Sequence, residues 1–244
     1  MKPPEIPVLY EDNHLIVIEK PVNMPSQEDP SGDLDALSAV REMIRIRDGK
    51  PGNVYLGLVH RLDRPVGGAM VFAKTSKAAS RMSELIRTRS IDKEYVAVVH
   101  GSLPQREGTL VHYLWKDPGT NMVHVVRKTH RQAKEAVLDY RVLGRTYGFS
   151  LVHIRLHTGR THQIRVQMAA SGCPLYGDQK YGARLNRPGQ QLALWSRRLA
   201  FIHPVRKTPL EISSLPPDAH PWNLWDRDLY AAAWESGPRE EEWR

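Results

Sequence analysis

A succession of strand-like segments separated by short turns is the feature that most constrains the fold of this chain. Five of them follow one another in its central part: "KEYVAVVHG", "GTLVHYLW", "NMVHVVRK", "EAVLDYRVLG" and "FSLVHIRLHTG". Apolar and polar residues alternate in many of them, which is typical of strands with one buried face. Short turns between such strands favour an antiparallel or mixed sheet over a parallel one.

The part of the chain before these segments predicts a hairpin, two helices and two further strands. "VLYEDNHLIVIEKP" indicates two strands around an acidic turn, ended by Pro21. "DLDALSAVREMIRIR" has apolar residues at helical spacing, with Asp33 as the expected N-cap, and Ser76 is the expected N-cap of a second helix. "NVYLGLVHRLD" and "GAMVFAK" predict the two strands between these helices.

The part after them predicts a third helix, two closing strands and a tail. Thr161 is the expected N-cap of the helix "HQIRVQMAASG", and "LALWSRRLAFIHP" and "PLEISS" indicate the strands. We find no internal repeat and no low-complexity linker, so residues 1–218 are expected to form one domain. The tryptophan-rich extension 219–244 is expected to pack on that domain as a helix, with "REEEWR" frayed.

The charge distribution indicates a polyanionic partner. The net charge is +8, and residues 1–35 hold two lysines against eight acids, so the remainder carries 33 basic and 19 acidic residues, or +14. Neutralisation of phosphates explains such an excess, although an ordinary arginine-rich surface explains it equally well.

Compartment and membrane association are restricted by cysteine content and hydropathy. The single cysteine, Cys173, excludes an intramolecular disulfide. No apolar run approaches the roughly 18 residues of a membrane span, and the N-terminus has no basic region followed by an apolar one. We therefore predict a soluble, cytoplasmic protein with no membrane partner.

Two segments place polar residues where the pattern demands burial. One is "HRLD", which begins at His60, and the other is "LHTGRTHQIR", which ends at Arg165. In the second, Arg160 and His162 lie near a predicted helix N-terminus, where backbone donors favour an anion. Both segments are candidates for a functional site.

The carboxylate of Asp63 needs a partner if it is buried, because an unpaired buried charge is costly. A fork-shaped pair with an arginine would keep Asp63 ionised at neutral pH, and an ionised carboxylate is a competent nucleophile or weak base. A structural ion pair that joins a strand to a helix is the alternative interpretation of the same residues.

Other kinds of site find little support in the sequence. His153, His157 and His162 suggest a metal site, but no carboxylate follows at ligand spacing. "GLVHRLDRPVGG" does not have the spacing of a phosphate loop, and no serine stands in a glycine-flanked elbow. We expect neither a metal nor a nucleotide cofactor.

Four ordered motifs resemble the RluA-type family of RNA pseudouridine synthases: "HRLDRPVGGAMVFAKT", "KEYVAVVHG", "LHTGRTHQIRVQMAASGCPLYGDQKYG" and "LALWSRRLAFIHP". The likeness covers roughly residues 8–215. It implies an α+β fold whose mixed, largely antiparallel sheet forms two interlocked halves flanked by helices, with a central basic cleft for ribosomal or transfer RNA. It also implies isomerisation of uridine to pseudouridine after the base is flipped out of the RNA.

The resemblance also implies a role for particular residues. Asp63 stands at the position of the catalytic aspartate, Tyr95 at that of a tyrosine that stacks on the uracil and assists proton removal, and Arg165 at that of the arginine that pairs with the aspartate. Arg61 matches an arginine that helps displace the target base, and Leu194 matches an apolar residue of the base pocket. His60, Arg160 and His162 complete the expected substrate-binding set.

The chain departs from the family pattern at two places. Val66-Gly67-Gly68 replaces a Thr-Ser-Gly run, and Trp195-Ser196 replaces His-Ala, which places the wall of the pocket and its RNA preference in question. A binding protein that kept the cleft and lost turnover is therefore an alternative, and a histidine-dependent metal nuclease or hydrolase is another. Many relatives carry an N-terminal S4 RNA-binding domain, for which no room is expected here, and we expect a monomer.

Overall fold

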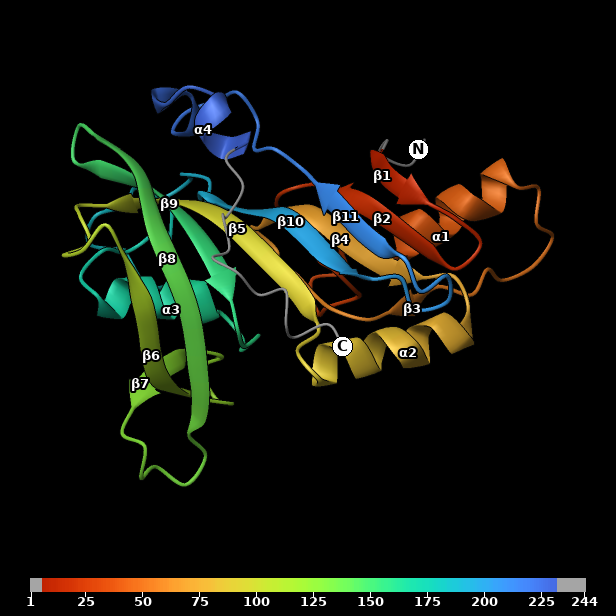
Figure 1. Ribbon diagram of the computed structural model, residues 1–244, viewed down its shortest axis with the longest axis horizontal. Coiled ribbons are helices and arrows are strands. Elements are labelled where there is room, and N and C mark those ends of the chain that lie inside the picture. Colours follow the sequence, from red (N-terminus) through yellow and green to blue (C-terminus); the bar gives the residue numbers. More distant parts are fainter. Residues whose placement is uncertain (1–5, 232–244) are drawn as a thin grey trace.

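The computed structural model describes residues 6–231 of the chain. In these residues the strands form a mixed sheet of eleven, in the order β1-β2-β4-β10-β5-β9-β8-β6-β7, with β11 beside β10 and β3 beside β4. Among the described strand pairs, β4 and β10 are parallel and the others antiparallel. The predicted α+β fold with a mixed, largely antiparallel sheet is confirmed (Figure 1).

The first half of the chain forms one side of the sheet and two long helices. The predicted hairpin is present, and its turn is closed by Asp12 Oδ1, which accepts from the amides of His14 and Leu15, each at 2.7 Å. The elements are β1 (Val8–Glu11), β2 (Leu15–Lys20), α1 (Ala36–Arg47), β3 (Gly57–Leu58), β4 (Gly67–Ala73) and α2 (Ser76–Arg87).

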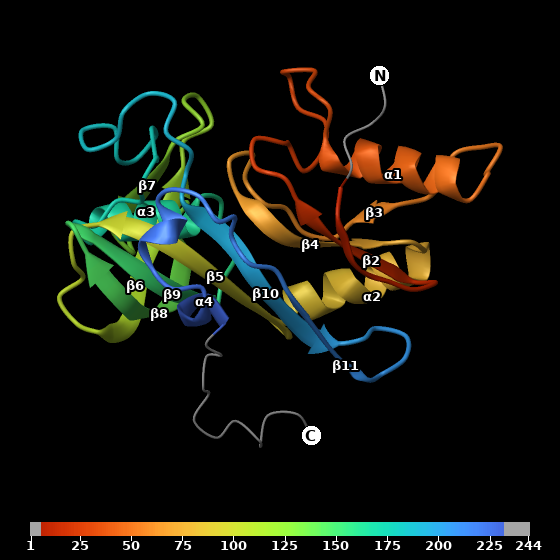
Figure 2. The ribbon, with the colours of Figure 1, turned by 90° about the horizontal axis from the view of Figure 1, so that it is seen from above.

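The second half forms the other side, and one of its strands returns to the first. Strand β10 lies between β4 and β5, so a late segment of the chain joins the two sides, as Figures 1 and 2 show. The elements are β5 (Ile91–His100), β6 (Glu107–Lys116), β7 (Val123–Val126), β8 (Lys134–Thr146), β9 (Phe149–Leu156), α3 (Gln163–Ala170), β10 (Leu194–Ile202) and β11 (Pro209–Ser213).

Alternate residues of the central strands enter different hydrophobic clusters. Tyr95, Ala97 and Leu194 pack with residues of α1 and α3 in a cluster that we call the front. Val96 and Trp195 pack with the C-terminal segment in a cluster that we call the back. Successive side chains of a strand point to opposite faces, so neighbouring residues are divided between the two.

All three predicted helices exist, but each begins one or more residues away from the expected cap. Asp35, not Asp33, caps α1 by accepting from Ser38 N at 3.0 Å, and Thr75, not Ser76, caps α2 by accepting from Ala78 N at 3.2 Å. Helix α3 begins after His162, which has a left-handed backbone (φ 51°) and makes no side-chain cap bond, so Thr161 is not its cap.

The strand predicted over "NVYLGLVHRLD" is wrong for most of its length. Of this segment, only Gly57 and Leu58 pair with β4. The amide of Val71 on β4 donates instead to His60 Nε2 at 3.0 Å. A side chain therefore satisfies a donor of β4, which allows the chain to leave the sheet at this point.

The start of the C-terminal extension packs on the back of the sheet. It contains a 3₁₀ turn (Trp222–Leu224) and a short helix, α4 (Asp228–Ala231), and Trp222 and Tyr230 are buried beside Trp195. The end of the extension, including "REEEWR", lies outside the described residues. The division of the chain at residue 218 stays a prediction.

Within residues 6–231 no helix is both long and apolar enough to cross a membrane.

Candidate active site

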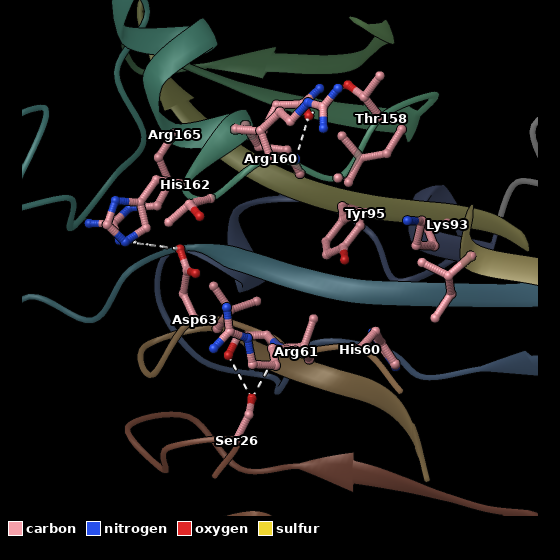
Figure 3. A pocket seen from close by; sticks show the side chains of 18 of the residues that line it. Ser26, His60, Arg61, Asp63, Lys93, Tyr95, Thr158, Arg160, His162 and Arg165 are labelled. Carbon is pink, nitrogen blue, oxygen red and sulfur yellow. Dashed lines mark hydrogen bonds and ion pairs between the residues drawn. The ribbon is translucent and has the colours of Figure 1, made fainter. Parts of the chain in front are cut away.

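All eight predicted site residues line one pocket of about 720 Å³. The pocket lies between the loop that follows β3, strand β5, the turn before α3 and the start of β10, so it is built from segments that are distant in the sequence (Figure 3). The residues are His60, Arg61, Asp63, Tyr95, Arg160, His162, Arg165 and Leu194.

The loop that carries Asp63 is fixed on both sides. On one side, His60 accepts from the amide of Val71. On the other, the hydroxyl of Ser26 donates to the carbonyl of Leu62 at 2.6 Å, and the amide of Leu62 donates back to it at 3.1 Å. Burial, followed by the charge of Lys93, lowers the pKa of His60 to about 3, so its ring is neutral and acts as a structural acceptor.

Two basic side chains at this loop, Lys20 and Arg64, have their polar groups bound by carbonyls or carboxylates of the protein. Lys20 is fully buried, and its ammonium donates to the carbonyls of Pro21, Met24 and Arg64 at 2.8, 2.7 and 3.2 Å. Burial lowers its pKa to about 7, against the opposing charge of Asp63. The Arg64 guanidinium binds Asp29 and Asp33, so it is not a partner of Asp63.

Asp63 is paired with Arg165, although the pair does not have the predicted geometry. Arg165 Nη1 donates to Asp63 Oδ2 at a long 3.4 Å. The Arg165 guanidinium instead makes a bidentate pair with the buried Asp178. Its Nε donates to Oδ2 at 2.8 Å and its Nη2 donates to Oδ1 at 2.7 Å. Burial alone would lower the pKa of Arg165, but Asp178 and Asp63 raise it, so the guanidinium stays charged. Asp63 thus keeps most of its acceptor capacity, and its side chain is 29% exposed.

His162 and Tyr181 form a second support beside the carboxylate. His162 Nε2 lies 3.8 Å from Asp63 Oδ2, and its Nδ1 is hydrogen-bonded to the hydroxyl of Tyr181 at 2.7 Å. That hydroxyl also accepts from the amide of Val123 at 3.0 Å, and the Arg165 guanidinium lies 5.2 Å from the centre of the Tyr181 ring. Burial lowers the pKa of His162, so the neutral ring is favoured at neutral pH.

Tyr95 and Leu194 provide the apolar part of the pocket. Both are buried in the front cluster and line the pocket from neighbouring strands. Burial, followed by the charge of Asp63, raises the pKa of the Tyr95 phenol well above its usual range. The ring therefore offers an uncharged surface on which a planar base can lie.

Arg61 and Arg160 lie at the pocket in different states. The side chain of Arg61 is exposed, with no ion-pair partner in the described part of the chain. Arg160 is partly anchored, since its Nε donates to the carbonyl of Glu135 at 2.9 Å. Arg61 is therefore the less anchored of the two cations.

Comparison with known proteins identifies the family of this chain. Residues 14–170 match the RNA pseudouridylate synthase family. The chain is 35% identical over 235 residues to ribosomal large subunit pseudouridine synthase D of Xanthomonas campestris. The aligned region covers 88% of this chain and 68% of that protein. This chain belongs to the RNA pseudouridylate synthase family.

Other relatives agree. An RNA pseudouridine synthase of Bacillus subtilis, YlyB, is 34% identical over 89% of this chain and 71% of its own length. The solved structure of human RNA pseudouridylate synthase domain containing 4 is 27% identical, with a TM-score of 0.72, over 86% of this chain and 88% of that one. The resemblance to the RluA type is confirmed, and the synthase isomerises uridine in RNA.

Of the residues at the two departures from the family pattern, only Val66 lines the pocket of this synthase. Trp195 belongs to the back cluster, where its indole N–H donates to Ser214 Oγ at 2.9 Å, so the expectation that it alters the pocket wall is wrong. A Cβ on Gly67 would stand 2.3 Å from the Trp195 ring. Gly67 and Trp195 are thus one packing unit, on the face opposite Tyr95.

The histidines of the metal alternative do not converge. His153 is buried on the back and lies 2.9 Å from Glu94, His157 lies 2.6 Å from Asp139, and His162 is in the pocket. Within residues 6–231 no group of three or more His, Cys, Asp or Glu side chains is placed to hold a metal ion.

Sequence reasoning missed several residues that support the site of this synthase. Asp178 and Tyr181 stand in "YGDQKYG", where polar side chains between glycines were the available signal. Ser26 and Lys20 carried no signal of their own, because a lysine and a serine near a strand end are ordinary surface residues. Their roles depend on contacts with a loop some 40 residues away.

Proposed function

We propose that this synthase modifies a uridine of large-subunit ribosomal RNA, flipped out of its helix and bound in the pocket of Asp63. The observation that carries the proposal is the Asp63 carboxylate, held 3.4 Å from Arg165 Nη1 and near Tyr95 at the centre of a basic pocket. The ribosomal substrate is supported by relatives named ribosomal large subunit pseudouridine synthase D, which are 34–35% identical to this chain.

In this proposal Tyr95 and Leu194 hold the uracil, and Asp63 reaches the nucleoside from the side. The bond between C1′ and N1 breaks, the uracil turns, and C1′ is joined to C5, while the C5 proton is lost and N1 gains a proton. The carboxylate acts by attack on the sugar, attack on the base or removal of a ribose proton, and each route requires it ionised.

The cations of the pocket bind and displace the RNA. Arg61 is exposed beside Asp63, so we propose that its side chain fills the space that the flipped base leaves in the RNA helix. Arg160 and His162 flank the opposite wall and bind the backbone or sugar of the flipped nucleotide. We further propose that the synthase works as a monomer in the cytoplasm.

The decisive test is release of tritium from carbon five of uridine. An unmodified large-subunit rRNA transcript labelled at this position is expected to lose about one equivalent of label per modified site, whereas a transfer RNA transcript is expected to retain its label. Mapping of pseudouridine in the same transcript then locates the position. Release from the transfer RNA alone would overturn the ribosomal assignment, and release from neither would overturn the proposal.

A further inference from the structure

Lys93 is a pocket residue with no role in the reaction described above. It stands two positions before Tyr95 on β5, so the two side chains share a face of the sheet. In Figure 3 Tyr95 lies between Asp63 and Lys93. The ammonium lies against the turn before α3, because a Cβ on Gly159 would be 3.3 Å from Lys93 Nζ.

The ammonium of Lys93 has no acceptor within residues 6–231. Neither a hydrogen bond nor an ion pair joins it to any described residue, in contrast to the buried Lys20, which donates to three carbonyls. His60, whose charge state Lys93 affects, accepts through Nε2 from Val71, so its proton is on Nδ1 and it offers Lys93 no acceptor. Burial lowers the pKa of Lys93, as expected for a cation without a counter-charge.

The surroundings of Lys93 favour an anion of the RNA backbone. Further cations line the pocket, among them Arg87, Arg89 and Arg160, of which Arg87 is paired with Glu84. Of the three acids that line the pocket, Asp29 is bound to Arg64, Asp63 is bound to Arg165, and Glu28 is exposed to solvent. A cation left open beside the aromatic surface suits a phosphate oxygen that arrives together with the base.

We propose that Lys93 Nζ binds a non-bridging oxygen of a phosphodiester next to the uridine that lies on Tyr95. The inference rests on the proposed function, because it assumes that an RNA nucleotide occupies this pocket. Gly159 keeps the ammonium accessible. Its backbone φ lies outside the left-handed region, so the backbone conformation does not require a glycine, but a larger side chain there would cover the ammonium.

The first test is the salt dependence of RNA binding. An unmodified large-subunit rRNA transcript is titrated against Asp63→Asn protein, with and without Lys93→Gln. We expect binding about tenfold weaker and a salt slope smaller by about one for Lys93→Gln. Lys77→Gln, which removes the same charge from an exposed position of α2 outside the pocket, is the matched control and is expected to change affinity less than about twofold. An unchanged slope in Lys93→Gln would overturn the proposal.

The second test identifies the phosphate. Short RNAs that contain the modified uridine carry a neutral methylphosphonate at its 5′ or 3′ linkage. One of these RNAs is expected to bind Asp63→Asn protein about tenfold more weakly than the RNA with unmodified linkages does. In protein that also carries Lys93→Gln, the neutral linkage is expected to cause no further loss of affinity. If, at both linkages, the loss of affinity from the methylphosphonate multiplied with the loss from Lys93→Gln, the phosphate would be bound by another residue. A drop in turnover of Lys93→Gln protein that keeps Asp63, with RNA binding unchanged, would place Lys93 on the uracil instead, and either result refutes the inference.

Two further measurements distinguish loss of the Lys93–phosphate contact from misfolding and from failure of the proposed function. The thermal midpoint of Lys93→Gln is expected to rise, because a half-buried cation without a counter-charge is removed. Gly159→Val leaves Lys93 in place and is expected to reproduce the weaker binding and the smaller salt slope, and failure to do so would contradict the access argument. The salt series uses inactive protein, so it still decides the role of Lys93 if the unsubstituted synthase forms no pseudouridine in this transcript.

Discussion

The two faces of strands β5 and β10 hold charged residues in opposite states. On the front, Asp63 receives one long contact from Arg165, and its side chain is 29% exposed. On the back, Glu94 is buried and receives Arg198, Arg197 and His153 at 2.8, 3.2 and 2.9 Å. The back satisfies its carboxylate completely, which stabilises the fold, whereas the front leaves its carboxylate able to react.

The largest expected effect is on the front. Asp63→Asn is expected to lower single-turnover pseudouridine formation by at least about 10³-fold, because the reacting carboxylate is lost, with RNA affinity unchanged. Asp92→Asn is the matched control, since Asp92 is on the back of β5 and binds Arg155 at 2.8 Å. Tritium release and filter binding measure the two quantities. An active Asp63→Asn protein would remove the carboxylate from the mechanism.

Loss of the back carboxylate is expected to change stability and leave the reaction intact. Glu94→Gln removes the buried carboxylate that both Arg197 and Arg198 contact, while Arg198 keeps Glu211, and it is expected to cost about 3 kcal/mol at pH 7. Burial would raise the pKa of Glu94, but His153, Arg198 and Arg197 lower it below its usual 4.5.

The sign of the pH effect follows. A depressed folded-state pKa contributes stability that is present above 4.5 and is lost as the pH falls through the lower, folded value. Urea unfolding at pH 7 and pH 3.5 is therefore expected to show a smaller difference between Glu94→Gln and the unsubstituted protein at the lower pH. A difference that does not shrink would contradict the assignment, and loss of activity in folded Glu94→Gln would break the separation of the two faces.

Gly67 and Trp195 allow the packing of the back to be tested with the family's own residues. Gly67→Ser is expected to cost about 2 kcal/mol, because its Cβ meets the indole. In the double variant Gly67→Ser, Trp195→His the two losses are expected to be less than additive by at least about 1 kcal/mol. Urea unfolding of the three variants measures this coupling, and strict additivity would show that the two departures are independent.

The smallest expected effect is at Ser196. Its hydroxyl donates to the carbonyl of Ala69 at 2.9 Å, so Ser196→Ala, the usual family residue, is expected to cost about 1 kcal/mol. Tritium release by the variant is expected to stay within about twofold of the unsubstituted synthase, since Ser196 does not line the pocket. A larger fall would show that the hydroxyl acts on Tyr95, its cross-strand partner.

The sequence predicted the strands well and the ends of elements poorly. Alternating segments such as "KEYVAVVHG" carry their own periodicity, and β5 covers Ile91–His100. The helix starts were misplaced, because Asp33, Ser76 and Thr161 are plausible caps and the choice between neighbours depends on tertiary contacts. Asp33 binds Arg64 instead of capping α1. The strand expected before Asp63 fails for the same reason, since His60 replaces its pairing with β4.

The sequence by itself determined the sheet, the family and the eight residues of the pocket, because periodicity and ordered motifs are local properties of the chain. Tertiary structure alone decided that Arg165 forks onto Asp178, that Trp195 faces the back, and that Lys93 has no acceptor in the described residues while Lys20 has three. Alternation assigns residues to a face, but the partner that each polar group meets comes from segments up to about a hundred positions away.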